Sequence, residues 1–308
     1  MRVTALAGGT GAAKFLRGLV SCVNPRDVTV IGNTADDAEI WGLHVSPDLD
    51  TVTYALTGHL DTGRGWGIAE DSFNALAAVA VLGGETWFRL GDRDLATHIY
   101  RTRALRAGLS LTDVTAAIGR GLGLRVRLLP MSDDPVRTRL ETPDGWLDFQ
   151  HYFVREGARP RVIGVEYAGA EKAAPAPGVL DAIRTADVVI VCPSNPITSI
   201  GPILSVPGVR EALHETNATV LAISPIVGGA PVSGPAGALM RACGLPVTAA
   251  GVARAYAPWL DLLVIDRRDI EETLAVREVG AEPVLGETIL IDHDREVALA
   301  RRVLEVAA

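Results

Sequence analysis

The sequence predicts an α/β fold: a Rossmann-like, doubly wound and mostly parallel sheet with an inserted α+β subdomain. The first observation is a series of short runs that are apolar on both faces, as strands buried in a parallel sheet are. The second is that helical patterns separate these runs, which implies right-handed crossovers. The runs are RVTALA (2–7), DVTVIG (27–32), DVVIVCP (187–193), ATVLAIS (218–224) and LDLLVID (260–266). Ligands of such a sheet bind outside the carboxyl ends of its strands.

The middle of the chain has a different pattern. Residues 85–125 are rich in helix formers, and Asp144-Gly145 is a typical hairpin turn. The segments that favour antiparallel strands are 124–131, 136–154 and 161–169. We therefore expect a single α/β domain over residues 1–308, with a helical and antiparallel β subdomain inserted at about 85–170 that covers part of the site.

Composition and charge limit the possible ligands. The 308 residues are 48% hydrophobic and 21% charged, which is enough to build a large core. The net charge of -8 provides no basic surface for nucleic acid or anionic lipid. Cys22, Cys192 and Cys243 match neither a zinc site nor a disulfide framework, and no leader or apolar run of about 20 residues is present. We expect a cytoplasmic protein that binds neither nucleic acid nor membrane.

A glycine-rich loop, GGTGAAKF (8–15), follows the first strand run. Its glycines allow close approach of a ligand, and the N-terminus of the next helix favours an anion. The loop fits neither a Walker A loop nor a dinucleotide fingerprint, because Lys14 follows Ala13 and stands where the fingerprint requires glycine. It predicts a phosphate site, although a tight strand-to-helix turn could have the same sequence.

Carboxylates gather after the second strand run. The segments NTADDAEIWGLHVSPDLDT (33–51) and HLDTGRGWGIAEDSF (59–73) contain Asp36, Asp37, Asp48, Asp50 and Asp61. Clustered hard oxygens suit Mg²⁺. In the alternative interpretation, Asp48 or Asp50 caps a helix that starts near Thr51 and the other carboxylates are solvated.

Further polar segments follow other predicted elements. The loops CPSNPITSIGPIL (192–204) and SPIVGGAPVSGPAG (224–237) offer amides and hydroxyls at the ligand edge of the sheet. In GDRDLATHIYRTR (91–103), Asp92 or Asp94 is interpreted as a helix cap and the arginines as a solvated face. Cys192 is interpreted as a buried apolar residue rather than a nucleophile.

Six motifs, in this order, resemble the 2-phospho-L-lactate transferase family (CofD) of coenzyme F-420 biosynthesis: GGTGAAK, SPDLDT, GDRDLATH, LPMSDDPV, CPSNPITSIGPIL and SPIVGGAPVSGPAG. The resemblance implies a magnesium-dependent transferase. In that family, the terminal ribityl hydroxyl of the deazaflavin Fo attacks a guanosine diphospholactate, or its phosphoenolpyruvate counterpart, and GMP is released. One departure is that two extra residues separate the acidic pair from Trp41.

The resemblance also implies roles for individual residues. Asp48, Asp50 and Asp61 are candidate magnesium ligands, and Asp50 and Asp48 are candidate catalytic residues, with Asp50 the candidate base. The candidate donor-binding residues are Gly8, Gly9, Thr10, Gly11, Lys14, Ser194, Asn195, Ser224, Gly228 and Gly229. The candidate deazaflavin-binding residues are Asn33, Trp66, His98, Ser132 and Asp133. We expect a homodimer.

Two other function classes remain to be compared with this one. A related gluconeogenesis-factor group has the same nucleotide fold and binds nucleotide sugars as a non-catalytic regulator. A nicotinamide oxidoreductase is disfavoured, because Lys14 interrupts the fingerprint and no acidic residue directly follows the second strand run. Release of GMP from the donor in the presence of Fo would distinguish the transferase from both.

Overall fold

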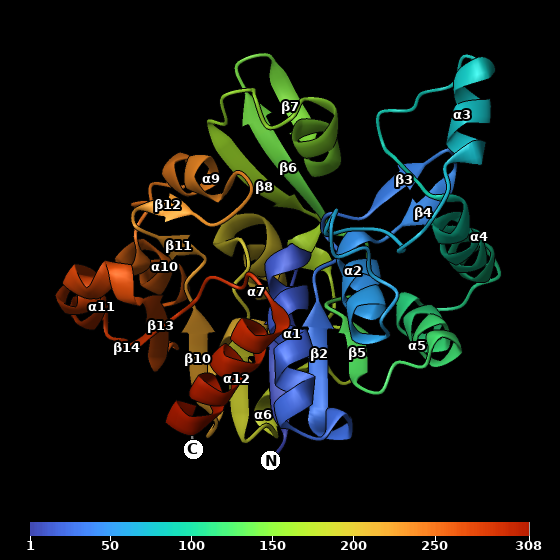
Figure 1. The fold of residues 1–308 in the computed structure, drawn as a ribbon. Coiled ribbons are helices and arrows are strands. Elements are labelled where there is room, and N and C mark those ends of the chain that lie inside the picture. The colour runs from blue at the N-terminus through green and yellow to red at the C-terminus, as the bar shows by residue number, and fades with distance from the viewer. Residues whose placement is uncertain (308) are drawn as a thin grey trace.

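A computed structural model, which describes residues 1–307, contains a parallel seven-stranded sheet (Figure 1). The strand order is β14-β13-β10-β9-β1-β2-β5, and every pairing is parallel. The strands are β1 (Val3–Ala7), β2 (Val28–Gly32), β5 (Arg127–Pro130), β9 (Val188–Val191), β10 (Thr219–Ile223), β13 (Leu262–Asp266) and β14 (Glu282–Gly286). The predicted fold class is confirmed, and all five predicted runs form strands of this sheet.

Two strands differ from the sequence prediction. β5 lies inside the segment 124–131, which was expected to be antiparallel; that expectation was wrong, because β5 pairs in parallel with β2. It is an edge strand whose Arg127 is exposed and whose Leu128 is buried, so it lacks the continuous apolar run of a central strand. β14 at the other edge contains Glu282 and Pro283 and gave no clear strand signal.

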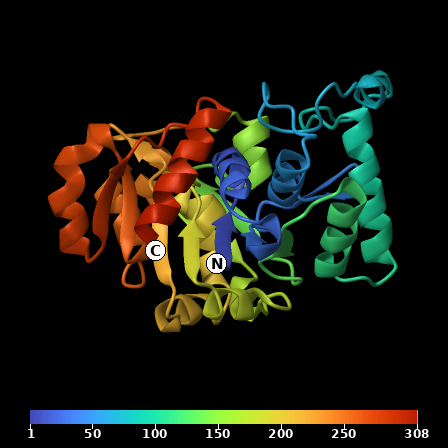
Figure 2. The ribbon, with the colours of Figure 1, turned by 60° about the horizontal axis from the view of Figure 1, so that its bottom comes forward.

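Helices cover both faces of the sheet. On one face α1 (Gly9–Cys22) packs against α12 (His293–Ala307), and Figure 2 shows the two side by side. Phe15 of α1 shares a buried cluster with Ala5, whereas Leu6, the next residue of β1, lies in a cluster with Val179 of α6. The other helices are α2 (Pro47–Leu56), α3 (Asn74–Val81), α4 (Asp92–Arg106), α5 (Leu111–Leu122), α6 (Val179–Arg184), α7 (Gly201–Ser205), α8 (Val209–Glu215), α9 (Ala236–Ala242), α10 (Ala249–Tyr256) and α11 (Thr273–Val279).

Two excursions leave the sheet on either side of β5. The first contains the hairpin β3 (Ala38–Ile40) and β4 (Leu43–Val45) and the helices α2 to α5. The second contains β6 (Arg137–Thr142), β7 (Gly145–Asp148) and β8 (Gly164–Ala168), an antiparallel sheet in the order β7-β6-β8. In Figure 1, β6, β7 and the β3–β4 hairpin stand beyond the carboxyl ends of the central strands. The division into one domain with an insertion at 85–170 stays a prediction.

Local structure agrees with the sequence in some places and not in others. The predicted turn at Asp144-Gly145 joins β6 to β7, and Gly145 has a φ of 121°. Residues 149–154 were expected to continue a strand, but His151–Arg155 form a helical turn. Throughout the part of the chain that the structure describes, no helix is both long and apolar enough for a membrane span.

The packing of α1 on α12 gives a test of the fold. A Cβ at Gly18 would lie 2.2 Å from the carbonyl oxygen of Glu296. We expect Gly18→Ala to lower the free energy of unfolding by about 1–3 kcal/mol, because the two helices must separate. Gly121→Ala in α5 is the matched control, since its Cβ would meet nothing within 4 Å; it should leave stability unchanged or raise it slightly. Urea unfolding measures both, and equal effects would contradict this packing.

Candidate active site

A cavity of about 590 Å³ lies at the carboxyl edge of the central sheet. Its walls come from the glycine loop, the segments after β9 and β10, and both excursions. The expectation of a loop over residues 8–15 was wrong in part, because only Gly8 precedes α1 and the rest forms its first turns. Cavities of this size hold small molecules and cofactors. The predicted residues that line it are Gly8, Gly9, Thr10, Gly11, Lys14, Asp48, Asp50, Trp66, His98, Ser194, Asn195 and Ser224.

The glycine loop is held closely by its neighbours. A Cβ at Gly8 would lie 2.7 Å from Asp48 Oδ2, and one at Gly11 would lie 2.1 Å from the carbonyl oxygen of Pro193. The amide of Gly9 donates a hydrogen bond of 2.8 Å to Asp48 Oδ1. Lys14 Nζ donates to the Leu290 carbonyl at 3.1 Å. The N-terminus of α1 therefore already holds an anion, the Asp48 carboxylate, as expected at a helix N-terminus.

Asp36 and Asp48 form a buried pair of carboxyl groups in the cavity wall. Asn33 does not line the cavity; its Nδ2 donates to Asp48 Oδ2 at 2.9 Å and to the Thr198 carbonyl at 3.1 Å. Burial raises the pKa of Asp48 to about 6. Burial, and then the charge of Asp48, raise the pKa of Asp36 well above its ordinary value. Asp36 Oδ1 has no hydrogen-bond partner, so the pair is placed to accept a cation or a proton.

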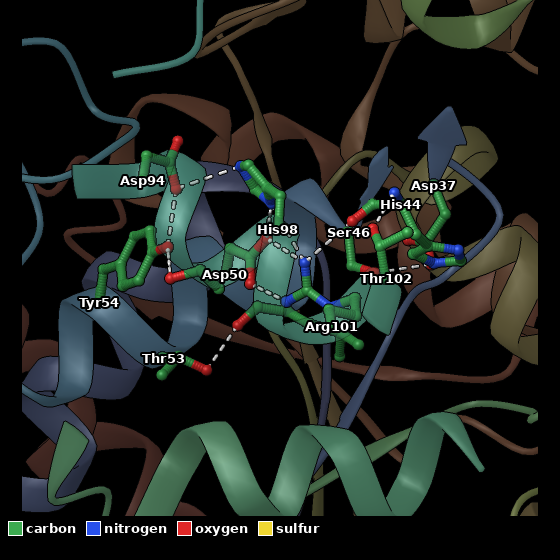
Figure 3. Close-up of polar contacts among 12 residues, drawn as sticks. Asp37, His44, Ser46, Asp50, Thr53, Tyr54, Asp94, His98, Arg101 and Thr102 are labelled. Carbon is green, nitrogen blue, oxygen red and sulfur yellow. Dashed lines mark hydrogen bonds and ion pairs between the residues drawn. The ribbon is translucent and has the colours of Figure 1, made fainter. Parts of the chain in front are cut away.

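Asp50 is held by a different set of side chains (Figure 3). Arg101 Nη1 donates to Asp50 Oδ2 at 3.0 Å, and Nη2 donates to Oδ1. His98 Nδ1 lies 3.3 Å from Arg101 Nη1, and His98 Nε2 lies 3.3 Å from Asp94 Oδ1. The Tyr54 hydroxyl donates to the same Asp94 oxygen at 2.7 Å. Asp48 and Asp50, two residues apart on α2, therefore serve different contacts.

The helix-cap interpretation of Asp48 and Asp50 is wrong. α2 begins at Pro47 rather than near Thr51, and Ser46 is its N-cap residue. The carboxylates of Asp48 and Asp50 bond to α1 and α4 instead of the first amides of α2. Both residues line the cavity and hold neighbouring elements instead of capping α2.

The buried charges do not balance. Of the eight carboxylate residues that are at most 9% exposed, five lie in the cavity wall or beside it in the chain: Asp36, Asp37, Asp48, Asp50 and Asp94. Within residues 1–307, Arg101 is the only lysine or arginine that is buried to this degree. Asp37 is held by His44 Nε2 at 2.9 Å and the Ser46 hydroxyl at 2.8 Å. The excess of negative charge thus falls on the Asp36–Asp48 pair.

The family model for 2-phospho-L-lactate transferase CofD matches residues 3–305. The chain belongs to the CofD family. It is 43% identical over 299 residues to the 2-phospho-L-lactate transferase of Methanosarcina mazei, covering 97% of this chain and 98% of that protein. It is 46% identical over 313 residues to the phosphoenolpyruvate transferase of Streptomyces griseus, covering 100% and 98%. It is therefore a transferase of the CofD type.

A solved structure has the same fold. A protein of the UPF0052 family from Bacillus halodurans superposes with a TM-score of 0.66 over 98% of this chain and 98–99% of that one. At 18% identity the likeness extends to the architecture alone. The overall architecture is thus found outside the sequences named as transferases.

Several predicted residues of this CofD-family chain lie away from the cavity lining. Asp61 accepts hydrogen bonds from the amide of Arg64 at 2.9 Å, from Arg64 Nε at 2.7 Å and from the amide of Gly63 at 3.0 Å. The amide of Arg64 makes the largest contribution to lowering the pKa of Asp61. Asp61 thus stabilises its own turn. It does not line the cavity, whereas Asp48 and Asp50 do.

The other predicted residues outside the lining also have local partners. The Ser132 hydroxyl donates to the Ala174 carbonyl at 2.6 Å, and Asp133 Oδ1 accepts from the amide of Thr112 at 2.7 Å. Gly228 and Gly229, with φ of 60° and 73°, form the turn between β11 (Ile226–Val227) and β12 (Ala230–Pro231). The loop after β10 instead reaches the cavity through Ser224, Pro225 and residues 232–236.

Sequence reasoning included His98 of α4 but missed the role of Arg101 on the same helix. The interpretation of its arginines as a solvated face was wrong for Arg101, which is 1% exposed. Asp94, His98 and Arg101 are spaced i, i+4 and i+7, so they share one helix face, and this spacing was the available signal. Neither Asp92 nor Asp94 caps α4, because Asp71 accepts from the first amides of that helix; Asp92 instead caps α3, whose first amides donate to it.

Two further sets of residues in the cavity wall belong to no sequence motif and were not predicted. Arg89 lines the cavity, with its guanidinium 4.8 Å from the centre of the Phe73 ring. An aromatic wall, defined as Trp87, Phe88, Phe149 and Phe153, comes from both excursions. The Phe149 and Phe153 rings lie 5.5 Å apart and nearly parallel. These residues are distant in sequence, so only the fold brings them together.

The raised pKa of Asp36 gives a stability prediction for metal-free protein. Its pKa in the folded state lies above the unfolded value of 3.8, so the folded state binds more protons and stability falls as pH rises through this range. Asp36→Asn removes the buried charge, and we expect it to stabilise the protein more at pH 7.5 than at pH 5. Urea unfolding with chelator at both pH values measures this, and an equal difference at both would contradict the assignment.

Proposed function

We propose that this protein transfers a phospholactyl or phosphoenolpyruvyl group from a guanosine diphospho donor to the terminal ribityl hydroxyl of the deazaflavin Fo, in coenzyme F-420 biosynthesis. In this reaction, the acceptor oxygen forms a bond to phosphorus as the bond to GMP breaks. The observation that carries the proposal is one cavity lined by Lys14, Ser194 and Asn195, by buried carboxylates and by an aromatic wall. Membership of the CofD family supports the reaction class. Relatives carry both donor names, so the donor stays open between lactate and enolpyruvate.

Lys14 and the loop after β9 suit the donor phosphates, whereas the Gly9 amide is already bonded to Asp48. The Ser194 hydroxyl lines the cavity, is buried and has no hydrogen-bond partner, so it is available to a phosphate oxygen. Asn195 Oδ1 accepts from the amide of Ile197 at 2.9 Å and fixes the shape of that loop. Lys14 supplies a point charge beside the loop. These groups can bind and neutralise an anionic leaving group.

The aromatic wall suits the planar deazaflavin. Phe153 is 40% exposed, so a flat ring that covers it would remove apolar surface from water. Aromatic side chains prefer offset stacking or edge contacts with other rings. Trp66, which the sequence predicted to bind the deazaflavin, also lines the cavity. It could contact the acceptor together with the aromatic wall.

Asp36 and Asp48 fit a magnesium ion better than the set expected from sequence. The two carboxylates lack a cationic partner, and Asp36 Oδ1 is an orphaned buried oxygen. Over residues 1–307, no three histidine, cysteine or carboxylate side chains are grouped to hold a metal. Magnesium commonly takes one or two carboxylates and completes its shell with water and substrate phosphate. When bound, it would offset the phosphate charge during transfer.

Asp50 suits a role toward the acceptor hydroxyl. Its carboxylate lines the cavity, and each of its oxygens retains acceptor capacity beyond the bond to Arg101. A hydrogen bond from the acceptor hydroxyl to Asp50 would orient the attacking oxygen. We therefore assign the metal to Asp36 and Asp48 and the orientation of the acceptor to Asp50.

Turnover tests the proposal. Wild-type protein with Fo, a guanosine diphospho donor and Mg²⁺ should release GMP, measured by liquid chromatography. Asp36→Asn and Asp48→Asn should each lower kcat by about two orders of magnitude, since each removes a charge that stabilises the transition state. Asp144→Asn in the β6–β7 turn is the matched control and should keep wild-type turnover.

Three results would contradict parts of this account. Donor binding without GMP release would favour the nucleotide-sugar-binding regulator. A loss in Asp61→Asn as large as that in Asp48→Asn would return Asp61 to the metal site. Turnover that chelator leaves unchanged would remove the metal from the proposal.

A further inference from the structure

The contact between α2 and α4 is polar although it is buried. α4 contributes Asp94, His98 and Arg101, and α2 contributes Asp50 and Tyr54 at i and i+4; each is at most 6% exposed. Removing such groups from water is costly, and apolar side chains often replace a buried ion pair without loss of stability. The fold alone therefore does not explain why these residues stand there.

Arg101 does not reach the cavity. The cavity lining contains Asp50, Tyr54, Asp94 and His98, but not Arg101. Two of its nitrogens hold the two oxygens of Asp50 (Figure 3). This bidentate arrangement fixes the plane of the carboxylate as well as its position. Any effect of Arg101 on a bound ligand must therefore pass through the lining residues that it contacts, Asp50 and His98, and only Asp50 is held by two bonds.

The other members of the network fix Arg101 in turn. Arg101 Nη1 also lies 3.3 Å from His98 Nδ1 and 3.5 Å from the His44 carbonyl oxygen. The opposite nitrogen of His98 faces Asp94, whose Oδ1 accepts the Tyr54 hydroxyl at 2.7 Å. His98 Nδ1 thus faces Arg101, whereas Nε2 lies near Asp94 without a hydrogen-bond partner. Two carboxylates of the network, Asp50 and Asp94, lie in the cavity wall, and Arg101 holds the first of them.

We propose that Arg101 is a positioning residue of the transfer reaction: it holds the Asp50 carboxylate in the orientation from which Asp50 accepts a hydrogen bond from the attacking hydroxyl of the acceptor. His98, Asp94 and Tyr54 hold the guanidinium in place. This inference rests on the proposed function and deepens it, because it adds a residue that touches no substrate. A purely structural ion pair would instead affect folding and leave the kinetics of folded protein unchanged.

The conservative substitution Arg101→Lys separates these two roles. An ammonium keeps the buried positive charge, but it cannot hold both carboxylate oxygens in one plane. We expect Arg101→Lys to lower kcat about tenfold, with a melting temperature and a KM for the donor close to wild type. Arg103→Lys on the same helix is the matched control, since Arg103 is exposed and lies outside the network; it should behave as wild type.

A double-mutant cycle tests whether Arg101 acts through Asp50. Arg101→Met should lower kcat about 100-fold when it is introduced into the wild type. Introduced into Asp50→Asn, the same substitution should change kcat by no more than about twofold, because the carboxylate that Arg101 positions is already gone. The double variant also removes both buried charges, so it should fold even where Arg101→Met is unstable. Wild-type kcat in folded Arg101→Lys, or losses that multiply in the cycle, would overturn the inference. No turnover by the wild type would overturn the proposed function itself.

Discussion

The bond from the Gly9 amide to the Asp48 carboxylate determines how the site is assembled. It joins the N-terminus of α1 to the first turn of α2. Because a Cβ at residue 8 would lie 2.7 Å from both Asp48 Oδ2 and Ser199 Cβ, this approach favours glycine there. Asn33, which follows β2, donates to Asp48 and to the loop after β9. One carboxylate thus sets the relative positions of three segments at the carboxyl edge of the sheet.

The same carboxylate also explains why we expect a cation in the site. A helix N-terminus stabilises one anion, and here that anion is Asp48 rather than a substrate. A phosphate that enters beside Asp48 and Asp36 adds like charge in a buried place, where repulsion is weakly screened. Arg101 does not relieve this, because it is committed to Asp50. A cation that accompanies the donor would satisfy both the pair and the phosphates.

The sequence was most informative where a single segment determines the structure. Runs that are apolar on both faces predicted the five inner strands, and the glycine loop and Asp48 were placed at the ligand edge. β5 was mistaken because an edge strand with the exposed Arg127 lacks that pattern. Arg101 was missed because most helical arginines face solvent. The sequence could not show whether Asp61 or Asp36 lies beside Asp48, since the positions of both depend on how the loops fold back rather than on spacing along the chain.

The most direct test of this account locates the cation. Mn²⁺ replaces Mg²⁺ at oxygen sites and scatters anomalously, so diffraction from crystals grown with Mn²⁺ and GDP would place it. The account predicts an anomalous peak within coordination distance of carboxylate oxygens of both Asp36 and Asp48, with the Asp50–Arg101 pair intact. A peak on Asp61, or one on Asp50 with Arg101 displaced, would contradict it.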